Sequence, residues 1–152
     1  SVLQLAREPD ALALPASGCE AREVRAFDDS YDAFFAAQAP ARGAVGVRDA
    51  RRLAWRYLER PRSTYASAEV RRGGHLAGWA VVARGRFAER DATLLVDLLV
   101  ERERGALTAL VAWAAERARA DGLPLVTLVP ESAPEFLALQ DLGLRVEPTP
   151  YT

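Results

Sequence analysis

The period of the apolar positions changes along the chain, and each period indicates a different element. Between Leu53 and Leu58 apolar residues recur at helical spacing, which predicts a helix that begins near Asp49 and ends at Pro61. Residues 92–100 are almost continuously apolar, as is typical of a central strand covered on both faces. The remaining pattern predicts strands at about 20–27, 65–71, 76–83, 125–129 and 144–147, and helices at about 31–39, 105–121 and 134–142.

Turn and capping residues support these boundaries. Asp28 and Asp29 stand where their carboxylates can accept the free N–H groups of a first helical turn. Gly73 and Gly74 tolerate the positive φ angles of a tight hairpin turn, and we expect a loop through Gly85 and Glu89 after the hairpin. The order β-α-α-β-β-β-α-β-α-β predicts an α/β fold with a mixed sheet, helices on both faces and a right-handed late crossover.

The beginning of the chain differs in pattern from the rest. Val2, Leu3 and Leu5 could form a short strand, but residues that break regular structure follow at Pro9, Pro15 and Gly18. We therefore interpret residues 1–19 as a lead-in segment and residues 20–152 as one domain. A chain that begins with serine and contains no methionine is expected to be processed or to be part of a longer protein.

Composition excludes several classes of function. Half of the 152 residues are apolar, which suits one globular domain, and 20 basic against 21 acidic residues leave a formal net charge of −1. A protein that binds nucleic acid or a membrane surface would carry a basic excess. Cys19 and His75 are single residues of their types, so neither an internal disulfide nor a zinc cluster is expected. Without a membrane-spanning apolar run, we expect a soluble, cytoplasmic protein.

Four stretches of sequence carry motifs in a distinctive order. They are LAWRY at 53–57 followed by Pro61 and Tyr65, GGHLAGWAVV at 73–82, VDLLV at 96–100 followed by a helix, and QDLGL at 140–144. In order and spacing these stretches resemble the GNAT (GCN5-related N-acetyltransferase) superfamily, whose members transfer acyl groups from acyl-CoA to amines. The resemblance spans about residues 20–147. In one bacterial group of such proteins, a domain of this kind often forms the second half of a longer chain.

The resemblance implies where the pantetheine arm of acyl-CoA would bind. In active GNAT enzymes, the strand that matches residues 96–100 separates from the next strand, and the pantetheine enters the gap. We therefore expect the backbone groups of Leu98, Leu99 and Val100 to hold it. A glycine-containing loop then directs N–H groups from a helix N-terminus toward the pyrophosphate, where the helix dipole also favours an anion.

The loop that matches this pyrophosphate motif comprises residues 101–106. The residues that the resemblance implies for the pyrophosphate are Arg102, Arg104, Gly105 and Ala106. The first glycine of the motif is absent, and Glu101 and Glu103 place two carboxylates where a diphosphate would lie. Because like charges repel, we predict a degenerate, weakened form of the acyl-CoA motif.

Asp97 is the best candidate for a general base. The attacking amine is mostly protonated near neutral pH, and a carboxylate on an apolar strand is suited to accept its proton. In the alternative interpretation, Asp97 pairs with an arginine such as Arg56 and has a structural role. Glu131, after the strand at 125–129, is a second candidate base, and its alternative is an ordinary acid near a helix N-terminus.

The general acid is harder to assign. Many GNAT enzymes protonate the departing thiolate with a tyrosine of the last helix, and the matching position here is Leu139, which cannot donate a proton. Tyr57 and Tyr151 remain as substitutes, and the spacing favours neither. Among the other conspicuous residues, we expect Trp79 in the core and the Arg71–Arg72 pair on a solvated face.

Two hypotheses of function follow. The first is an N-acyltransferase that uses acetyl-CoA or another acyl-CoA, in which a small-molecule or protein amine attacks the thioester directly and no acyl-enzyme forms. The second is a non-catalytic GNAT-fold module that supports, dimerises with or regulates an active partner, either a second copy or an adjacent domain of the same chain. The degenerate loop and Leu139 favour the second hypothesis, whereas the order of the motifs favours the first.

Overall fold

The computed structural model describes residues 3–42, 48–59 and 65–151, so Pro61 lies outside the described residues. These residues form a seven-stranded sheet in the order β2-β3-β4-β5-β6-β1-β7, in which β5 and β6 pair in parallel and the other neighbours are antiparallel. The strands are β1 (Leu3–Arg7), β2 (Ala21–Val24), β3 (Tyr65–Arg72), β4 (His75–Phe87), β5 (Arg90–Val100), β6 (Leu125–Thr127) and β7 (Arg145–Pro148).

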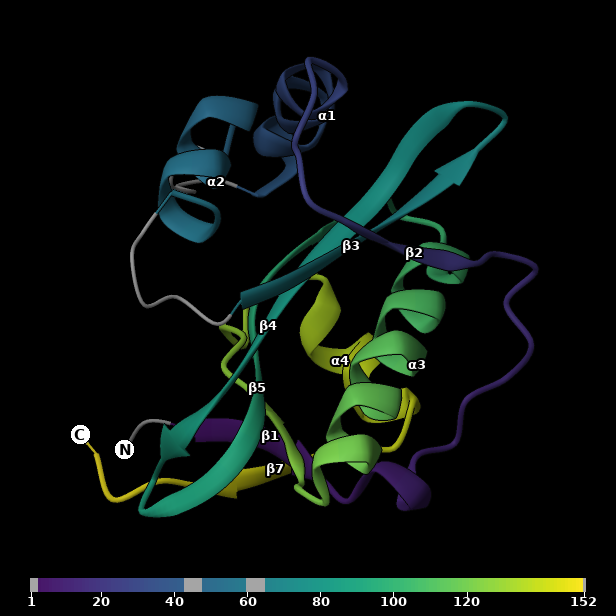
Figure 1. The fold of residues 1–152 in the computed structure, drawn as a ribbon. Coiled ribbons are helices and arrows are strands. Elements are labelled where there is room, and N and C mark those ends of the chain that lie inside the picture. Colours follow the sequence, from purple (N-terminus) through teal and green to yellow (C-terminus); the bar gives the residue numbers. More distant parts are fainter. Residues whose placement is uncertain (1–2, 43–47, 60–64, 152) are drawn as a thin grey trace.

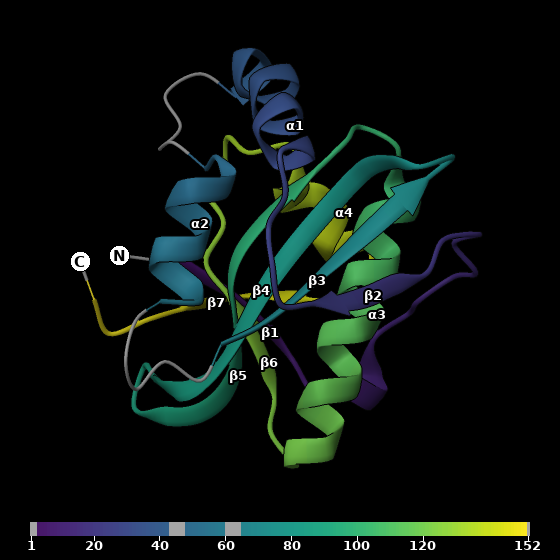
Figure 2. The ribbon, with the colours of Figure 1, turned by 45° about the horizontal axis from the view of Figure 1, so that its top comes forward.

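Helices cover both faces of this sheet, as the sequence predicts (Figure 1). Helices α1 (Ser30–Gln38) and α2 (Ala50–Tyr57) lie together on one face. Helices α3 (Arg104–Asp121) and α4 (Glu135–Asp141) lie on the other, and Figure 2 shows α3 running along the strands. Two short 3-10 helices, at Pro9–Ala11 and Ala39–Arg42, complete the described elements.

Each face of the sheet has its own hydrophobic core. The core beneath α3 and α4 contains Val82 and Leu95 together with the inner side chains of both helices. The core beneath α1 and α2 contains Leu99 and Trp79, which is fully buried, so the predicted burial of Trp79 is confirmed. The near-continuous apolar sequence of β5 follows from this arrangement, because alternate residues enter different cores.

The local signals at several element ends are confirmed. The carboxylate of Asp49 accepts the Arg52 N–H at 2.9 Å and caps α2. Gly122 ends α3 with a φ of 69°, a left-handed conformation that glycine adopts without steric cost. At the start of α1 the capping bond comes from Asp28, whose Oδ1 accepts the Ser30 N–H, whereas the side chain of Asp29 makes no capping bond.

The predicted loop through Gly85 and Glu89 is wrong. β4 continues through Gly85 to Phe87, and β5 begins at Arg90, so the two strands form one long hairpin. Ala88 and Glu89 make its turn with φ angles of 51° and 66°. Because neither turn residue is a glycine, the sequence carries no ordinary signal for this tight turn.

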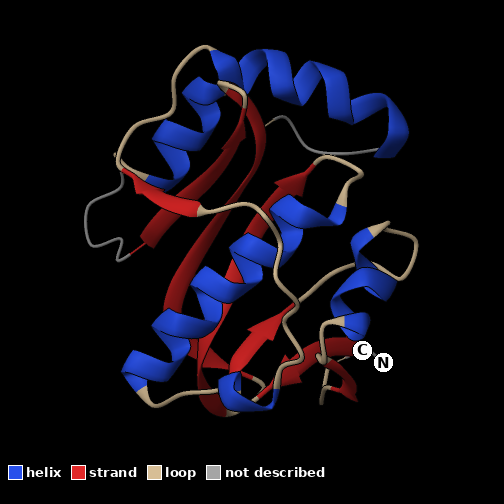
Figure 3. Cartoon of the chain, turned by 90° about the vertical axis from the view of Figure 1, so that its right-hand side faces the viewer, coloured by secondary structure: helices blue, strands red, loops and turns tan. Residues whose placement is uncertain are grey.

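The N-terminal segment contributes an interior strand to the sheet, next to the edge strand β7. β1 lies between β6 and β7 and pairs antiparallel with both, and its Leu5 and Ala6 are 1% exposed. The suggested short strand is therefore present, and part of the predicted lead-in segment is integral to the sheet. Figure 3 shows the two ends of the chain beside each other as a result.

Candidate functional site

The strand β5 extends beyond the end of its parallel partner β6. Their last paired residues are Leu95 and Thr127, and the Thr127 hydroxyl donates a buried 2.9 Å hydrogen bond to the Leu95 carbonyl at that point. β5 then continues to Val100, and no described strand pairs with residues 96–100 on the β6 side. The parallel pairing therefore ends before residues 96–100, where the resemblance implies that the strands separate, and β6 is shorter than the predicted 125–129.

A β-bulge at Val96 sets the direction of the side chains that follow it. Val81 pairs with Asp97, and Val82 pairs with Leu95, so Val96 is the extra residue. Leu95 enters the core beneath α3, whereas Asp97 contacts α2 and lies on the opposite face. Without the bulge, Leu95 and Asp97 would share one face because strand side chains alternate with a period of two.

A cleft of about 730 Å³ lies at the end of β5. It is lined by Gln38 at the end of α1, by the loop between β5 and α3, and by the first turns of α3 and α4. Elements from both faces of the sheet therefore meet there. Of the residues predicted to bind acyl-CoA, Val100, Arg102 and Arg104 line the cleft.

The other predicted acyl-CoA residues have packing roles in the structure. The Leu99 side chain is buried beneath α1 and α2, and the Leu98 side chain packs partly buried against the core beneath α3. Ala106 is fully buried. At Gly105, an added Cβ would lie 3.0 Å from Sγ of Cys19 and 3.1 Å from the carbonyl oxygen of Ser17. Because glycine has no side chain, the segment before β2 can pack directly against Gly105.

The two acidic residues of the loop have an arginine partner that the sequence analysis did not assign. Nη1 of Arg72 forms ion pairs with both Glu101 and Glu103. Arg104 pairs with Asp141 of α4 at 2.6 Å. Arg72 is exposed, as predicted for a solvated face, and its guanidinium offsets the two carboxylates expected to repel a diphosphate. Arg71 departs from that prediction, because it is only partly exposed and pairs with Glu69 and Asp28.

Asp97 is a buried carboxylate whose two oxygens both accept hydrogen bonds. Its Oδ1 accepts from Nε of Arg48 at 2.8 Å and from the N–H of Leu98 at 3.1 Å, and its Oδ2 accepts from the hydroxyl of Tyr57 at 2.7 Å. The alternative interpretation, in which Asp97 pairs with an arginine, is thus confirmed, but the arginine is Arg48 instead of Arg56. Burial and the adjacent Asp97 charge raise the pKa of Tyr57 above its usual range.

The second candidate base lies elsewhere. Glu131 is exposed in the turn between β6 and α4 and is not among the described residues that line the cleft. The buried carboxylate in this region is Glu135, in the first turn of α4, which does line the cleft. Glu135 is not among the residues predicted from the sequence, although an acid in a first helical turn is a recognisable signal.

The tyrosine substitutes are now distinguishable. The hydroxyl of Tyr57 donates to Asp97, the candidate base. The ring of Tyr151 packs against the ring of Phe87, with 5.5 Å between the ring centres. Leu139 is fully buried in the core beneath α3 and α4. Tyr57 is therefore the tyrosine of the candidate site. Arg48, the other side-chain donor to Asp97, had no sequence signal because it lies outside every motif.

Comparison with solved structures identifies the fold. A ribosomal-protein-alanine N-acetyltransferase from Brucella melitensis matches with a TM-score of 0.64 at 16% identity, over 88% of this chain and 97% of that one. A GCN5-related N-acetyltransferase from Anabaena variabilis matches with a TM-score of 0.69 at 11% identity, over 97% of this chain. This chain has the GNAT fold. At such identities the likeness concerns the fold alone, and no protein-family model and no curated protein matches the sequence.

The GNAT-fold structures that resemble this chain differ in length. The chain spans 38% of the Anabaena variabilis protein and 52% of a GCN5-related N-acetyltransferase from Kribbella flavida, which matches with a TM-score of 0.54 at 18% identity over 93% of this chain. Over residues 3–42, 48–59 and 65–151, no helix is long and apolar enough to cross a membrane. In the same described part of the chain, no group of three or more His, Cys, Asp or Glu side chains could hold a metal ion.

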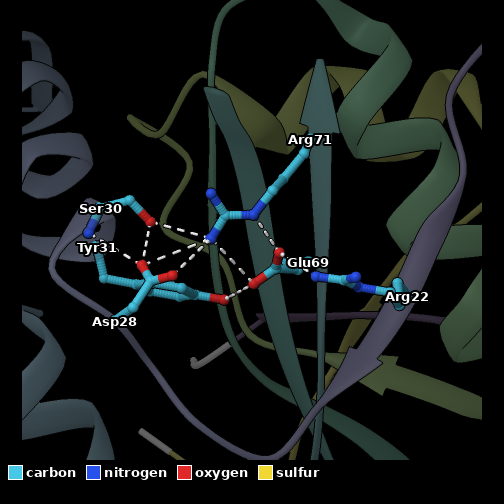
Figure 4. A network of polar contacts seen from close by, with 6 residues as sticks. All are labelled: Arg22, Asp28, Ser30, Tyr31, Glu69 and Arg71. Carbon is cyan, nitrogen blue, oxygen red and sulfur yellow. Dashed lines mark hydrogen bonds and ion pairs between the residues drawn. The ribbon is translucent and has the colours of Figure 1, made fainter. Parts of the chain in front are cut away.

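A second polar network joins α1 to the sheet. Glu69 of β3 is 3% exposed, and its carboxylate accepts from the Tyr31 hydroxyl at 2.9 Å and from the guanidinium of Arg71. Burial by itself raises the pKa of Glu69, but the hydrogen bonds from Arg71 and Tyr31 hold it below its ordinary value. Figure 4 shows the whole network, which comprises Arg22, Asp28, Ser30, Tyr31, Glu69 and Arg71.

Proposed function

We propose that the protein is an N-acyltransferase that transfers an acyl group from acyl-CoA to an amine. The observation that carries the proposal is the position of the buried Asp97 carboxylate, two residues beyond the point where the pairing of β5 with β6 ends. Asp97 is not among the described residues that line the cleft, so the proposal places the acceptor amine along β5 beyond its pairing with β6, beside this carboxylate. The GNAT fold of the solved N-acetyltransferases supports the same reaction class.

The residues around the cleft fit acyl-CoA in different degrees. Pairing with β6 ends at Leu95, so residues 96–99 have no β6 partner, which suits the amide-containing pantetheine arm, although the Leu98 N–H already donates to Oδ1 of Asp97. The first turn of α3 offers N–H groups and the positive end of a helix dipole. Arg102 lines the cleft and has no ion-pair partner among the described residues, so its charge is available to a phosphate. Gly105 instead serves packing against Ser17 and Cys19.

In the proposed reaction, acyl-CoA supplies an activated thioester and the acceptor supplies an amine. The amine nitrogen forms a bond to the acyl carbon as the carbon–sulfur bond breaks. Asp97 accepts the proton that the amine must lose, and an equivalent proton reaches the CoA thiolate through solvent, which regenerates the carboxylate and balances the charges without an acyl-enzyme. Arg48 and Tyr57 orient the Asp97 carboxylate, and Oδ2, which accepts only the Tyr57 hydroxyl, keeps a lone pair for the amine proton. The acceptor is a small-molecule or protein amine.

Titration calorimetry with acetyl-CoA and desulfo-CoA tests the first part of the proposal. We expect binding in the micromolar range that weakens as salt increases, because phosphate recognition is electrostatic. An acceptor screen with Asp97→Asn then tests the chemistry: binding should persist and transfer should fall by at least about a hundredfold. Asp91→Asn is the matched control, since Asp91 lies on the same strand but is exposed. Equal transfer by Asp97→Asn and Asp91→Asn would remove Asp97 from the mechanism.

A second candidate function is a non-catalytic module that supports an active partner, either a second copy or an adjacent domain. Two observations favour it: Leu139 occupies the position of the family's tyrosine, and both oxygens of Asp97 already have protein donors. For such a module, neither acetyl-CoA nor desulfo-CoA releases heat or raises the unfolding temperature at millimolar concentration. That result would replace the enzyme proposal.

A further inference from the structure

The tip of the β3–β4 hairpin reaches the loop that leads into α3. Arg72 ends β3 and faces His75 across a turn in which Gly73 and Gly74 have φ angles of 58° and 80°. From this position its guanidinium pairs with Glu101 and Glu103. A backbone hydrogen bond of 2.9 Å, from the N–H of Glu101 to the carbonyl of Ala77, also ties the loop to the hairpin.

The two carboxylates held by Arg72 belong to the lining of the cleft. Glu101 and Glu103 alternate with Arg102 and Arg104 along the same loop, and all four residues line the cleft. Arg104 is paired with Asp141 of α4, and the buried Glu135 lines the same cleft, so Arg102 is left to face three acids. Without Arg72, the loop would present a net negative charge beside the N-terminus of α3 and would oppose any anion there.

We propose that Arg72 is a charge-compensating residue that makes this cleft acceptable to a diphosphate-bearing ligand. The inference rests on the proposed function, because the diphosphate is that of CoA. Arg72 acts through Glu101 and Glu103 and need not touch the ligand, so it is a positioning residue. Its effect therefore disappears when the two acids are neutral, and it is confined to ligands that carry the diphosphate.

A cycle of four proteins tests this role by calorimetry at low salt. They are the unaltered chain, Arg72→Ala, Glu101→Gln/Glu103→Gln, and the triple variant that combines these changes. We expect Arg72→Ala to weaken CoA binding roughly three- to tenfold in the unaltered background, as for partly exposed charges, and less than about twofold in the neutral background. The loss of CoA affinity caused by Arg72→Ala should be smaller at high salt, because salt screens the charges. Pantetheine, which lacks the diphosphate, should bind all four proteins equally.

Arg84→Ala is the matched control. Arg84 lies toward the opposite end of β4, is exposed and has no ion-pair partner among the described residues, so its removal changes net charge by the same amount. It should alter CoA binding less than about twofold. Thermal unfolding of each variant separates loss of folding from loss of binding.

Two results would overturn the inference alone while leaving the proposed function intact. One is an equal loss of CoA affinity from Arg72→Ala in both backgrounds, which would mean that Arg72 contacts the ligand or shapes the cleft. The other is an equal loss of affinity for pantetheine. Folded proteins that all fail to bind CoA would overturn the proposed function, and this inference with it.

Discussion

The hydroxyl of Tyr57 on α2 donates a 2.7 Å hydrogen bond to Oδ2 of Asp97 on β5. This bond joins the helical layer to the strand immediately after the bulge at Val96. The position of α2 and the orientation of the candidate base are therefore linked. A substitution that displaces α2 should therefore change the orientation of the Asp97 carboxylate more than it changes the cleft at the end of β5.

Tyr57→Phe should lower the free energy of unfolding by about 1–3 kcal/mol. The substitution keeps the buried ring but leaves Oδ2 of Asp97 without its donor, and an unsatisfied buried acceptor is destabilising. Urea denaturation measures the change. Tyr65→Phe is the control, because the two rings are in contact at 5.0 Å but the Tyr65 hydroxyl makes no hydrogen bond among the described residues. Equal losses for the two variants would contradict the importance of the Tyr57 bond.

Glu69→Gln should destabilise the fold in a pH-dependent way. The pKa of Glu69 in the folded chain lies below the ordinary value of 4.5, so the ionised carboxylate stabilises the folded state at neutral pH. This contribution is lost as the pH falls from 4.5 through the lowered pKa. Urea denaturation at pH 7 should show a deficit of about 1–3 kcal/mol for Glu69→Gln, and the deficit should shrink in acid. A deficit that is constant with pH would mean that the charge is unimportant.

Leu5→Ala should be as damaging as a substitution in the centre of the core. Leu5 is 1% exposed on β1, and truncation of a fully buried leucine removes about 2–4 kcal/mol of stability. Leu14→Ala is the control from the same N-terminal segment, because Leu14 is only partly buried. Urea denaturation measures the free energy of unfolding of both variants. If neither value falls appreciably, β1 does not contribute to the stability of the sheet in solution.

Gly78→Ala should disturb the packing beneath the cleft. A Cβ at Gly78 would lie 2.8 Å from Cγ1 of Val100 and 3.2 Å from Cδ1 of Leu110, so side chains in a filled core must shift. Overpacking of this kind removes about 1–3 kcal/mol. Gly85→Ala is the control on the same strand, since its Cβ would meet only the end of Leu94, at 3.1 Å. The unfolding temperature of Gly78→Ala should be lower than that of Gly85→Ala. The reverse order would show that the packing around Gly78 is not tight.

Most elements of the fold were predictable because their signals are local. The apolar run of β5, the helical spacing around Leu53 and the glycine at the end of α3 each act within one element. The turn at Ala88 and Glu89 was not predictable, because its backbone conformation is imposed by the pairing of two long strands. The place of β1 was also hidden, since strand order depends on contacts between distant residues.

The site was predictable only in part, for a related reason. Asp97 could be found from sequence because a carboxylate interrupts an apolar strand. Its partners could not: Arg48 lies between the predicted elements, and Tyr57 was one of two equivalent tyrosines until the structure placed its hydroxyl. The charge of the loop was misjudged because Arg72 approaches Glu101 and Glu103 from another hairpin.

The insertion of β1 between β6 and β7 constrains the order in which the molecule can form. Leu3 pairs with Pro148, so a strand synthesised near the beginning of this sequence acquires that neighbour only after nearly all of it has left the ribosome. Before β6 and β7 are synthesised, β1 lacks the two strands with which it pairs in the sheet. Closing so long a loop is entropically slow, and this part of the sheet should therefore be completed last during biosynthesis.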